Sequence, residues 1–212
     1  MDSVTEKIAK LKILPVVTVE NPDDAVPLAG ALTAGGIPAA EITFRTDAAA
    51  ETIRNASRVY PDMLIGAGTV LTTAQADAAR EAGAKFIVSP GFDAETVRYC
   101  LKIGLPVFPG CATATEVQQA LRLGLDVLKF FPAEAAGGLR ALKALSAPFP
   151  KVRWMPTGGI SLKNLSDYLS FPRILACGGS FLTPKDDVRT KNWAAVTDVC
   201  RKTVRLIHGE PV

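Results

Sequence analysis

The sequence predicts a single (β/α)8 barrel, the fold known as the TIM barrel, with a short helix before its first strand. Short apolar stretches alternate along the chain with stretches of helical pattern, and such alternation requires a parallel sheet. Glycine recurs about once per strand–helix unit, directly before a strand, at Gly83, Gly104 and Gly124. The 212 residues lie near the lower end of barrel sizes, whereas the alternative, an open flavodoxin-like sheet, normally needs fewer strands.

The first elements have clear local signals. Residues 2–12 can form a short polar helix, and the β-branched stretch 13–19 predicts the first strand. The sequence Asn-Pro-Asp-Asp at 21–24 predicts a helix start, because Asn21 or Asp23 can cap the helix and acidic residues suit its N-terminal end. This helix ends at the glycine pair 35–36, which is a C-cap signal.

The later elements follow the same alternation. Apolar runs predict the strands, and several helical stretches stop at a glycine just before the next strand. The further strands expected are 39–44, 63–67, 86–89, 106–109, 127–131, 152–156 and 174–177. The helices expected after them are 47–59, 73–82, 93–103, 113–123, 138–145, 162–169 and 192–207.

The composition excludes several classes of protein. With 48% hydrophobic and 21% charged residues and no break that marks a linker, the chain is predicted to be one domain over 1–212. Its 24 basic and 21 acidic residues form no long basic run, so neither nucleic acid nor a membrane is an expected partner. No stretch reaches transmembrane length and residues 1–12 lack a signal sequence, which predicts a cytoplasmic protein.

Cysteine and histidine usage limits the chemistry. The four cysteines have no CxxC spacing, which is typical of free thiols in a reducing compartment. The single histidine, His208, lies near the C-terminus, so a Ser-His-Asp site would have to recruit a tail residue. A zinc site built mainly of histidines cannot form in one such chain, and we expect no metal and no cofactor.

Lys129 is the first candidate catalytic residue. It stands in the apolar run Val-Leu-Lys-Phe-Phe (127–131), which ends at Pro132 and predicts a buried strand. Alternation places Val127, Lys129 and Phe131 on one face of that strand. A buried amine is costly unless it is paired or neutral, and a neutral amine attacks carbonyl groups. The alternative is a lysine that extends from the strand end into solvent.

A second strand brings further charge to the same region. Glu41, Thr43 and Arg45 alternate with apolar residues, so their shared face is predicted to line the barrel interior and its mouth. Active sites of such barrels lie at the carboxyl ends of the strands. A structural Glu–Arg pair is the alternative, although two charges inside a barrel are expensive structural devices.

Glycine-rich segments follow four of the predicted strands. The segments Gly-Ala-Gly-Thr at 66–69 and Ser-Pro-Gly at 89–91 are weak signals that could be plain turns. The last two strands end in Thr157-Gly158-Gly159 and Gly178-Gly179-Ser180, where backbone N–H groups can bind an anion without obstruction by a Cβ. Tight turns explain one such pair well and both poorly, so a phosphate site is favoured.

These groups together suit carbon–carbon bond cleavage through a Schiff base. Lys129 would attack a ketone, and the protonated imine would withdraw electrons from the adjacent carbon. Glu41 would move protons, and Arg45 would hold the carboxylate of a 2-keto acid through two N–H donors. The expected partner is therefore a small phosphorylated 2-keto acid.

The motifs also resemble those of a known family. In order along the chain, EITFRT, GAGTVL, SPGF, KFFPAE, PTGGIS and CGGSFL are similar to 2-keto-3-deoxy-6-phosphogluconate (KDPG) aldolases, class I enzymes also active on 4-hydroxy-2-oxoglutarate (KHG). The resemblance extends from about Leu14 to Leu182. It implies a (β/α)8 barrel, a homotrimer, and pyruvate and glyceraldehyde 3-phosphate as products of KDPG cleavage.

The resemblance also implies residue roles. Lys129 matches the Schiff-base lysine and Glu41 the proton-transferring glutamate of the family. Thr157 matches a position tied to stereoselectivity at C4. The pyruvate-binding positions match Arg45, Thr69 and Pro90, and the phosphate site matches Gly158, Gly159 and Ser180, beside Gly178 and Gly179.

Three alternatives stay open at this point. One is the C4-epimeric, galactonate-type substrate for the same aldolase chemistry. A phosphosugar isomerase or epimerase would share the barrel but needs two acid/base groups or a metal and no amine nucleophile. A non-catalytic sugar-phosphate sensor would bind ligand without exchanging pyruvate methyl protons in deuterated water.

Overall fold

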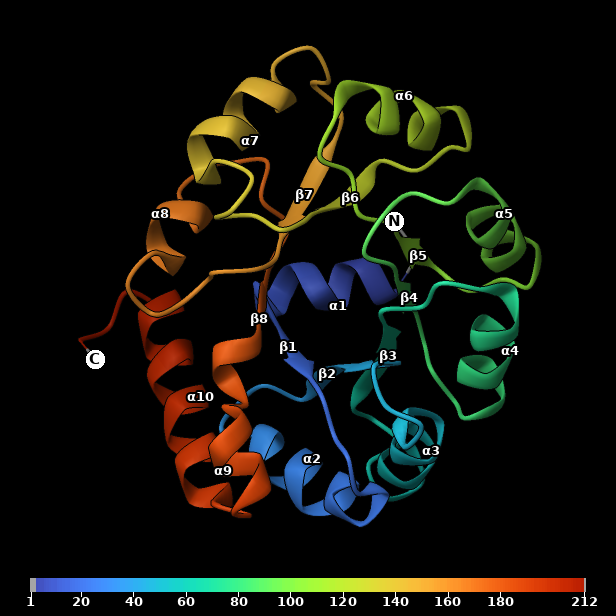
Figure 1. Ribbon diagram of the computed structural model, residues 1–212. Helices are drawn as coiled ribbons and strands as arrows, with labels where there is room; N and C mark the ends of the chain where they lie inside the picture. The colour runs from blue at the N-terminus through green and yellow to red at the C-terminus, as the bar shows by residue number, and fades with distance from the viewer. Residues whose placement is uncertain (1–2, 212) are drawn as a thin grey trace.

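The computed structural model describes residues 3–211. In the view of Figure 1 the strands lie around a centre, the first helix lies across that centre, and the other helices lie outside the strands. Each strand pairing is parallel, as the alternation of strands and helices predicted. The strands in the described chain are β1 (Ile13–Val17), β2 (Ala39–Thr43), β3 (Leu64–Gly68), β4 (Ile87–Val88), β5 (Val107–Phe108), β6 (Val127–Phe130), β7 (Arg153–Pro156) and β8 (Cys177–Gly179).

The helices agree with the predicted ones to within a few residues, with additions near the C-terminus. The short helices η2 and α9 between β8 and the last helix were not predicted. The start of the first helix at Asp2 falls outside the described residues. The helices are α1 (Ser3–Leu11), η1 (Pro22–Asp24), α2 (Ala25–Ala34), α3 (Ala49–Val59), α4 (Thr73–Glu81), α5 (Ala94–Lys102), α6 (Ala114–Arg122), α7 (Gly138–Ser146), α8 (Leu165–Leu169), η2 (Ser180–Leu182), α9 (Lys185–Arg189) and α10 (Trp193–Ile207).

The strands of residues 3–211 form a curled six-stranded sheet in the order β5-β4-β3-β2-β1-β8 and a separate pair, β6-β7. Isolated parallel bridges connect the two groups. Gly110, after β5, bridges to Lys129 in β6, and Thr157, after β7, bridges to Gly178 in β8. The carboxyl end of β6 is therefore held between its neighbours at the position of Lys129.

Local capping explains where several helices begin. Of the two residues predicted as possible caps, Asn21 accepts a hydrogen bond from the backbone N–H of Asp23 at 3.1 Å. Thr113 and Glu116 form a reciprocal capping box at the start of α6. These contacts satisfy N–H groups that have no partner within the helix.

Each face of the strands packs against its own cluster of buried apolar residues. An inner cluster fills the space that the sheet encloses, and an outer cluster lies between the strands and the helices. Ala39 and Val127 belong to the inner cluster, whereas their neighbours Ala40 and Leu128 belong to the outer one, so the predicted alternation is confirmed. The inner cluster consists of Ile8, Leu14, Ala39, Leu64, Phe86, Val88, Phe108, Val127, Met155, Leu175 and Ala176.

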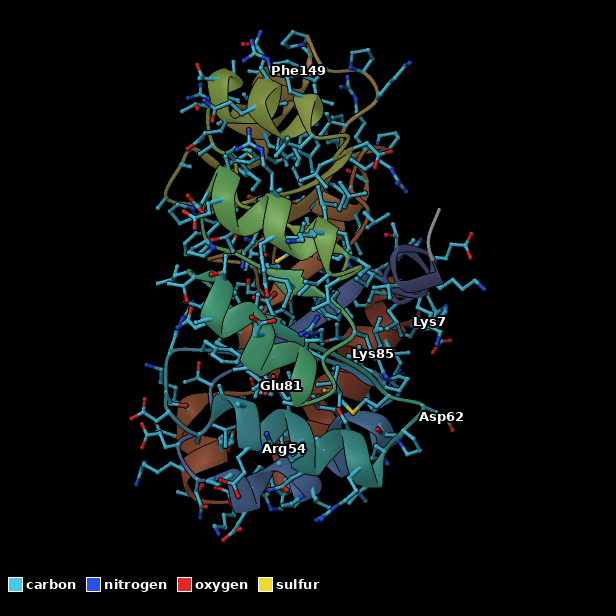
Figure 2. All side chains as sticks on the ribbon, turned by 90° about the vertical axis from the view of Figure 1, so that its right-hand side faces the viewer. Lys7, Arg54, Asp62, Glu81, Lys85 and Phe149 are labelled. Atoms are coloured by element: carbon cyan, nitrogen blue, oxygen red, sulfur yellow. The ribbon has the colours of Figure 1, made fainter. Side chains whose placement is uncertain are left out.

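Helix α1 covers the amino ends of the strands. Its residue Ile8 is completely buried in the inner cluster. In the view of Figure 2, Lys7 of α1 lies on the same side of the molecule as Asp62 and Lys85, which precede β3 and β4. The loops that follow the strands therefore lie at the opposite end. Among residues 3–211, no helix combines the length and apolar character needed to cross a bilayer.

The last strand differs from the prediction. It was expected at 174–177, but β8 is Cys177–Gly179, and Gly178 and Gly179 pair with Leu14 and Pro15 of β1. The sequence placed the two glycines after the strand, as part of a phosphate site. Their hydrogen-bond register with β1, which no local pattern reveals, extends the strand through them.

Candidate active site

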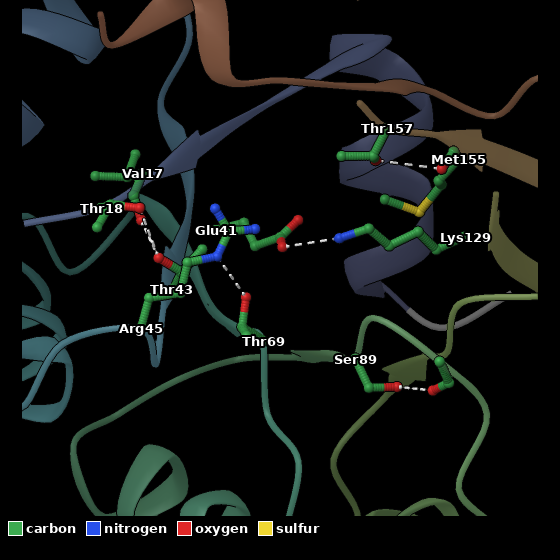
Figure 3. A network of polar contacts seen from close by, with 11 residues as sticks. Val17, Thr18, Glu41, Thr43, Arg45, Thr69, Ser89, Lys129, Met155 and Thr157 are labelled. Carbon is green, nitrogen blue, oxygen red and sulfur yellow. Dashed lines mark hydrogen bonds and ion pairs between the residues drawn. The ribbon is translucent and has the colours of Figure 1, made fainter. Parts of the chain in front are cut away.

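The inner face of the sheet carries one buried ion pair at its carboxyl end. Lys129 Nζ lies 3.2 Å from Glu41 Oε1, and the two side chains are only 5% and 2% exposed (Figure 3). The pair joins β2 to β6, so two residues 88 positions apart in the chain meet across the interior. The predicted inward position of Glu41 and the predicted burial of Lys129 are both confirmed. The alternative of a lysine extended into solvent is wrong, because Lys129 is buried.

Lys129 has an aromatic neighbour on its own segment. Its Nζ lies 5.2 Å from the ring centroid of Phe131, close enough for a cation–π contact. Met155 of β7 pairs with Lys129 in the strand register. The amine therefore has one charged partner and otherwise largely apolar surroundings, which is the environment expected for a lysine that reacts with carbonyl groups.

Beyond Glu41, separate polar contacts hold the carboxyl end of β2. Thr43, two residues further along β2, is fully buried and donates to the carbonyl oxygen of Val17 at 2.9 Å. Its hydroxyl also lies 2.9 Å from that of Thr18. These bonds connect the end of β2 to the end of β1, and they hold the strand that carries Glu41.

Arg45 stands at the rim, as the alternation of β2 predicted. It is exposed, and its Nε donates to the hydroxyl oxygen of Thr69 at 3.3 Å. Thr69 has a φ of 54°, a left-handed conformation that is uncommon for a β-branched residue. No described carboxylate forms an ion pair with Arg45. Its terminal guanidinium donors can therefore serve an anionic ligand.

Pro90 belongs to the loop beside the lysine strand. A Cβ on Gly110 would lie 2.0 Å from the carbonyl oxygen of Pro90, and Gly110 bridges to Lys129. The absence of a side chain at Gly110 thus lets the loop after β4 approach β6. The Ser89 hydroxyl donates to the Gly91 carbonyl oxygen at 2.7 Å and holds this turn.

Thr157 lies directly after β7, within the same interior. It is buried, and it bridges to Gly178, whose missing Cβ would lie 2.2 Å from the Thr157 hydroxyl oxygen. A Cβ on Gly179 would lie 2.8 Å from the ring of Phe181. The space at both glycines is thus taken by protein side chains. Ser180, by contrast, is exposed at the start of η2.

The loop of Gly158 and Gly159 is a ready donor of backbone N–H groups. Both glycines have left-handed φ values, 100° and 79°, which glycine adopts without strain. Their carbonyl oxygens accept hydrogen bonds from the N–H of Glu134 and the side chain of Asn164, at 3.1 and 3.0 Å. Within residues 3–211 their own N–H groups donate to no protein acceptor. This loop can therefore offer two N–H groups to an anion.

The side chain of Glu134 packs against the loop of Gly158 and Gly159, a role that its sequence position did not predict. A Cβ on Gly159 would lie 2.5 Å from Glu134 Cγ, so the glutamate stem packs directly under the loop. The hydroxyl group of buried Tyr168 donates to its carboxylate. Burial and this bond raise the pKa of Tyr168, which keeps the phenol protonated as a donor.

The glycines of β3 have a purpose other than the predicted one. The sequence favoured a plain turn at residues 66–69 over a close approach of a ligand to the backbone. Both lie inside the strand, where a Cβ on Gly66 would meet the Phe86 ring at 2.3 Å and one on Gly68 would meet Glu41 Oε1 at 2.3 Å. They make room for two neighbouring side chains, a fact that depends on the register between strands.

The four cysteines offer no competing nucleophile. All are free, as their spacing predicted, and all are buried. Burial raises the pKa of Cys111, Cys177 and Cys200 to about 12 and that of Cys100 to about 11. They are therefore neutral thiols at physiological pH. Among residues 3–211, no three histidine, cysteine or acidic side chains gather where they could hold a metal ion.

Comparison with known proteins agrees with the chemistry that this geometry indicates. The sequence model described as KDPG and KHG aldolase matches residues 4–199. The 2-dehydro-3-deoxy-phosphogluconate aldolase of Treponema pallidum is 47% identical, over 98% of this chain and 99% of that protein.

Solved structures of KDPG aldolases are also similar to this chain. The KDPG aldolase of Legionella pneumophila, with pyruvate captured at low pH as a covalent carbinolamine, has a TM-score of 0.91 and 40% identity, covering 94% of this chain and 97% of its own. That of Zymomonas mobilis with 3-phosphoglycerate has a TM-score of 0.89 and 39% identity, covering 96% of each chain. The chain therefore belongs to the KDPG and KHG aldolase family.

Proposed function

We propose that the protein is a class I aldehyde-lyase that cleaves KDPG to pyruvate and glyceraldehyde 3-phosphate and also cleaves KHG. The observation that carries this proposal is the buried pair of Lys129 and Glu41, because it puts an amine beside a proton acceptor in a water-poor interior. The family supports the assignment, since its members carry this activity in their names.

The reaction begins with proton transfer inside the pair. The 3.2 Å between Lys129 Nζ and Glu41 Oε1 allows direct passage of a proton from ammonium to carboxylate. The free amine then attacks the C2 ketone of the substrate to give a carbinolamine. Glu41 returns a proton to the departing hydroxyl group, so that water leaves and a protonated imine forms.

The protonated imine serves as the electron sink for bond cleavage. Glu41 takes the proton of the C4 hydroxyl group, the C3–C4 bond breaks, and its electron pair moves into the enamine while the aldehyde leaves. Glu41 then gives the proton to C3, and water hydrolyses the imine to release pyruvate and free Lys129. One carboxylate thus handles each proton in turn, which microscopic reversibility permits in either direction.

Other residues of the rim hold the ends of the substrate. Arg45 binds the carboxylate with its remaining guanidinium donors, assisted by Thr69 and Pro90. Gly158, Gly159 and Ser180 bind the phosphate group, while Gly178 and Gly179 carry Ser180 to the rim. Thr157, buried beside Gly178, stands near C4 and contributes to the choice between C4 epimers.

The direct test is a coupled assay for pyruvate release from KDPG, from its C4 epimer and from KHG. KDPG is expected to be the best of the three. Substrate binding without pyruvate release or methyl-proton exchange would indicate a sensor. Conversion of the substrate without any borohydride-trapped adduct on a lysine would indicate an isomerase or epimerase. Either result would refute the aldolase proposal.

The phosphate assignment can be tested by placing a charge at the rim. Ser180→Asp puts a carboxylate beside the phosphate position on an exposed residue, so repulsion should lower kcat/KM for KDPG about tenfold or more. KHG lacks the phosphate group, and its C5 carboxylate lies closer to C4 and further from this position, so its turnover should fall much less. We prefer this variant to Gly159→Val, because Gly159 has a left-handed φ and packs on Glu134.

The control for this test is Ser166→Asp, which adds the same charge to another exposed serine, on α8. It should leave the ratio of kcat/KM for KDPG and KHG unchanged. If a folded Ser180→Asp variant loses kcat/KM equally for both substrates, the phosphate group does not bind beside Ser180.

Chelation should not affect the enzyme. The protonated imine on Lys129 supplies the electron sink that a Lewis acid would otherwise supply, so no step needs a metal. We expect kcat with KDPG to be the same after dialysis against EDTA as before it. Loss of activity with EDTA and its recovery with zinc would contradict this expectation.

We further infer that the strands close into one (β/α)8 barrel and that residues 1–212 form one domain. The isolated bridges from β5 to β6 and from β7 to β8 support closure, since they connect the two sheets on both sides. Free thiols fit the cytoplasm. The family resemblance supports a homotrimer, which light scattering can check.

A further inference from the structure

We propose that Gly68, the last residue of β3, is a positioning residue for Glu41, because its missing side chain is the space that the Glu41 carboxylate occupies. This inference rests on the proton-transfer role proposed for Glu41. A Cβ at Gly68 would lie 2.3 Å from Glu41 Oε1, 2.6 Å from Cγ and 2.8 Å from Cδ. Non-bonded heavy atoms do not approach one another so closely.

The strand register explains why this space lies at Gly68. In the parallel pair β2–β3, Glu41 is opposite Gly66 and Thr43 is opposite Gly68. The space over Gly66 is filled by the Phe86 ring, which lies 2.3 Å from where a Cβ would be. The Glu41 side chain therefore extends over Gly68, toward the carboxyl end of the sheet. There it meets Lys129 from the opposite strand.

Backbone conformation gives no other reason for a glycine here. Gly68 is not among the residues with positive φ, unlike Gly158 and Gly159. Its carbonyl oxygen accepts a hydrogen bond from the N–H of Phe44 at 2.7 Å, and an alanine could accept the same bond. An alanine would thus suit the strand itself, and the conflict would be with the side chain of Glu41.

A methyl group at this position should turn the carboxylate away from Lys129. The main-chain atoms of β2 and β3 are held by pairing, so the Glu41 side chain is the part that can move. Misplacement of a reacting group by about 1 Å can lower a rate about 10²-fold. Arg45 and the Gly158–Gly159 loop, the groups proposed to hold the two ends of the substrate, are not among the atoms nearest to a Cβ at Gly68. Gly68→Ala should therefore lower kcat and spare KM.

The test compares Gly68→Ala with Gly66→Ala, which adds the same methyl group two residues away, against the Phe86 ring. For Gly68→Ala we expect kcat with KDPG and the exchange rate of pyruvate methyl protons to fall together, about 10²-fold, with KM within about threefold. Borohydride with pyruvate should still label Lys129. Gly66→Ala should lower the melting temperature and, where folded, keep its exchange rate within about tenfold of wild type. Wild-type exchange in folded Gly68→Ala would overturn the inference.

A stability measurement covers the case in which Gly68→Ala folds poorly. The reference background is Glu41→Ala with Lys129→Met, because removing Glu41 alone would leave Lys129 as a buried unpaired cation. Gly68→Ala should lower the melting temperature in the native background and change it little in this one. Equal losses in both backgrounds would mean that the methyl group collides with something other than Glu41.

The two proposals fail in different ways. If Glu41→Gln keeps its full kcat, the proton-transfer role is wrong, although the stability coupling between Gly68 and Glu41 would still appear. If Glu41→Gln loses kcat while Gly68→Ala keeps it, Gly68 does not position the carboxylate and the role of Glu41 stands.

Discussion

Lys129→Met is expected to lower kcat for pyruvate release by about 10⁴-fold or more, because it removes the covalent route altogether. Methionine has nearly the shape of lysine without the amine, so the packing beside Met155 and Phe131 can remain. The uncatalysed retro-aldol step lacks the protonated imine, and Glu41 alone cannot replace that electron sink. The measurement is a coupled assay under saturating KDPG, with folding checked by circular dichroism.

Mass spectrometry identifies the reacting lysine independently of activity. Borohydride reduction with pyruvate should add a pyruvyl-sized mass to the peptide that contains Lys129, and Lys129→Met should abolish this gain. Lys143→Met serves as the matched control, since Lys143 contacts Phe171 at the surface and lies outside the site. A label on Lys85 or Lys143 in the wild-type protein would show that the assignment of Lys129 is wrong.

Glu41→Gln is expected to reduce kcat by about 10²–10⁴-fold with a modest change in KM, because it removes the proton carrier of every step. The amide keeps the size of the side chain. Its oxygen can still accept a hydrogen bond from Lys129 Nζ, which lies 3.2 Å from Glu41 Oε1 in the wild-type protein. The substrate-holding groups at the rim are untouched, which is why binding should persist.

The exchange reaction separates proton transfer from bond cleavage. In deuterated water, Glu41→Gln should lower the exchange rate of the pyruvate methyl protons by about the same factor as it lowers kcat for KDPG cleavage. Glu20→Gln, at an exposed glutamate after β1, is the control and should behave as wild type. An unchanged kcat or exchange rate in a folded Glu41→Gln variant would refute the proton-transfer role.

Local patterns predicted much of this fold. Helix caps such as Asn21 and Thr113 act within a few residues, so their effect can be deduced from adjacent positions. Strand alternation is equally local, and it correctly assigned Glu41 to an inward position and Arg45 to the rim. The apolar run around Lys129 likewise predicted its burial. The family motifs added residue roles that no periodicity contains.

Elements without a periodic pattern were predicted less well. Helix α9 has only five residues, too few for an amphipathic repeat to be recognised. Strand β8 runs through Gly178 and Gly179, which local preference assigns to a turn. Here pairing with β1 outweighs the weak preference of glycine against strands, because the pairing satisfies backbone hydrogen bonds that would otherwise be buried without partners.

The sequence by itself determined the alternation of strands and helices, the inward faces and the chemical types at the strand ends, since each depends on residues close together in the chain. Only the tertiary structure decided that Lys129 meets Glu41 at 3.2 Å, that Glu134 supports the Gly159 loop and that Gly68 leaves the space for Glu41. These contacts arise from strand register and from the volume left between side chains of distant segments. Close packing allows one such arrangement, and it involves residue pairs that no local pattern connects.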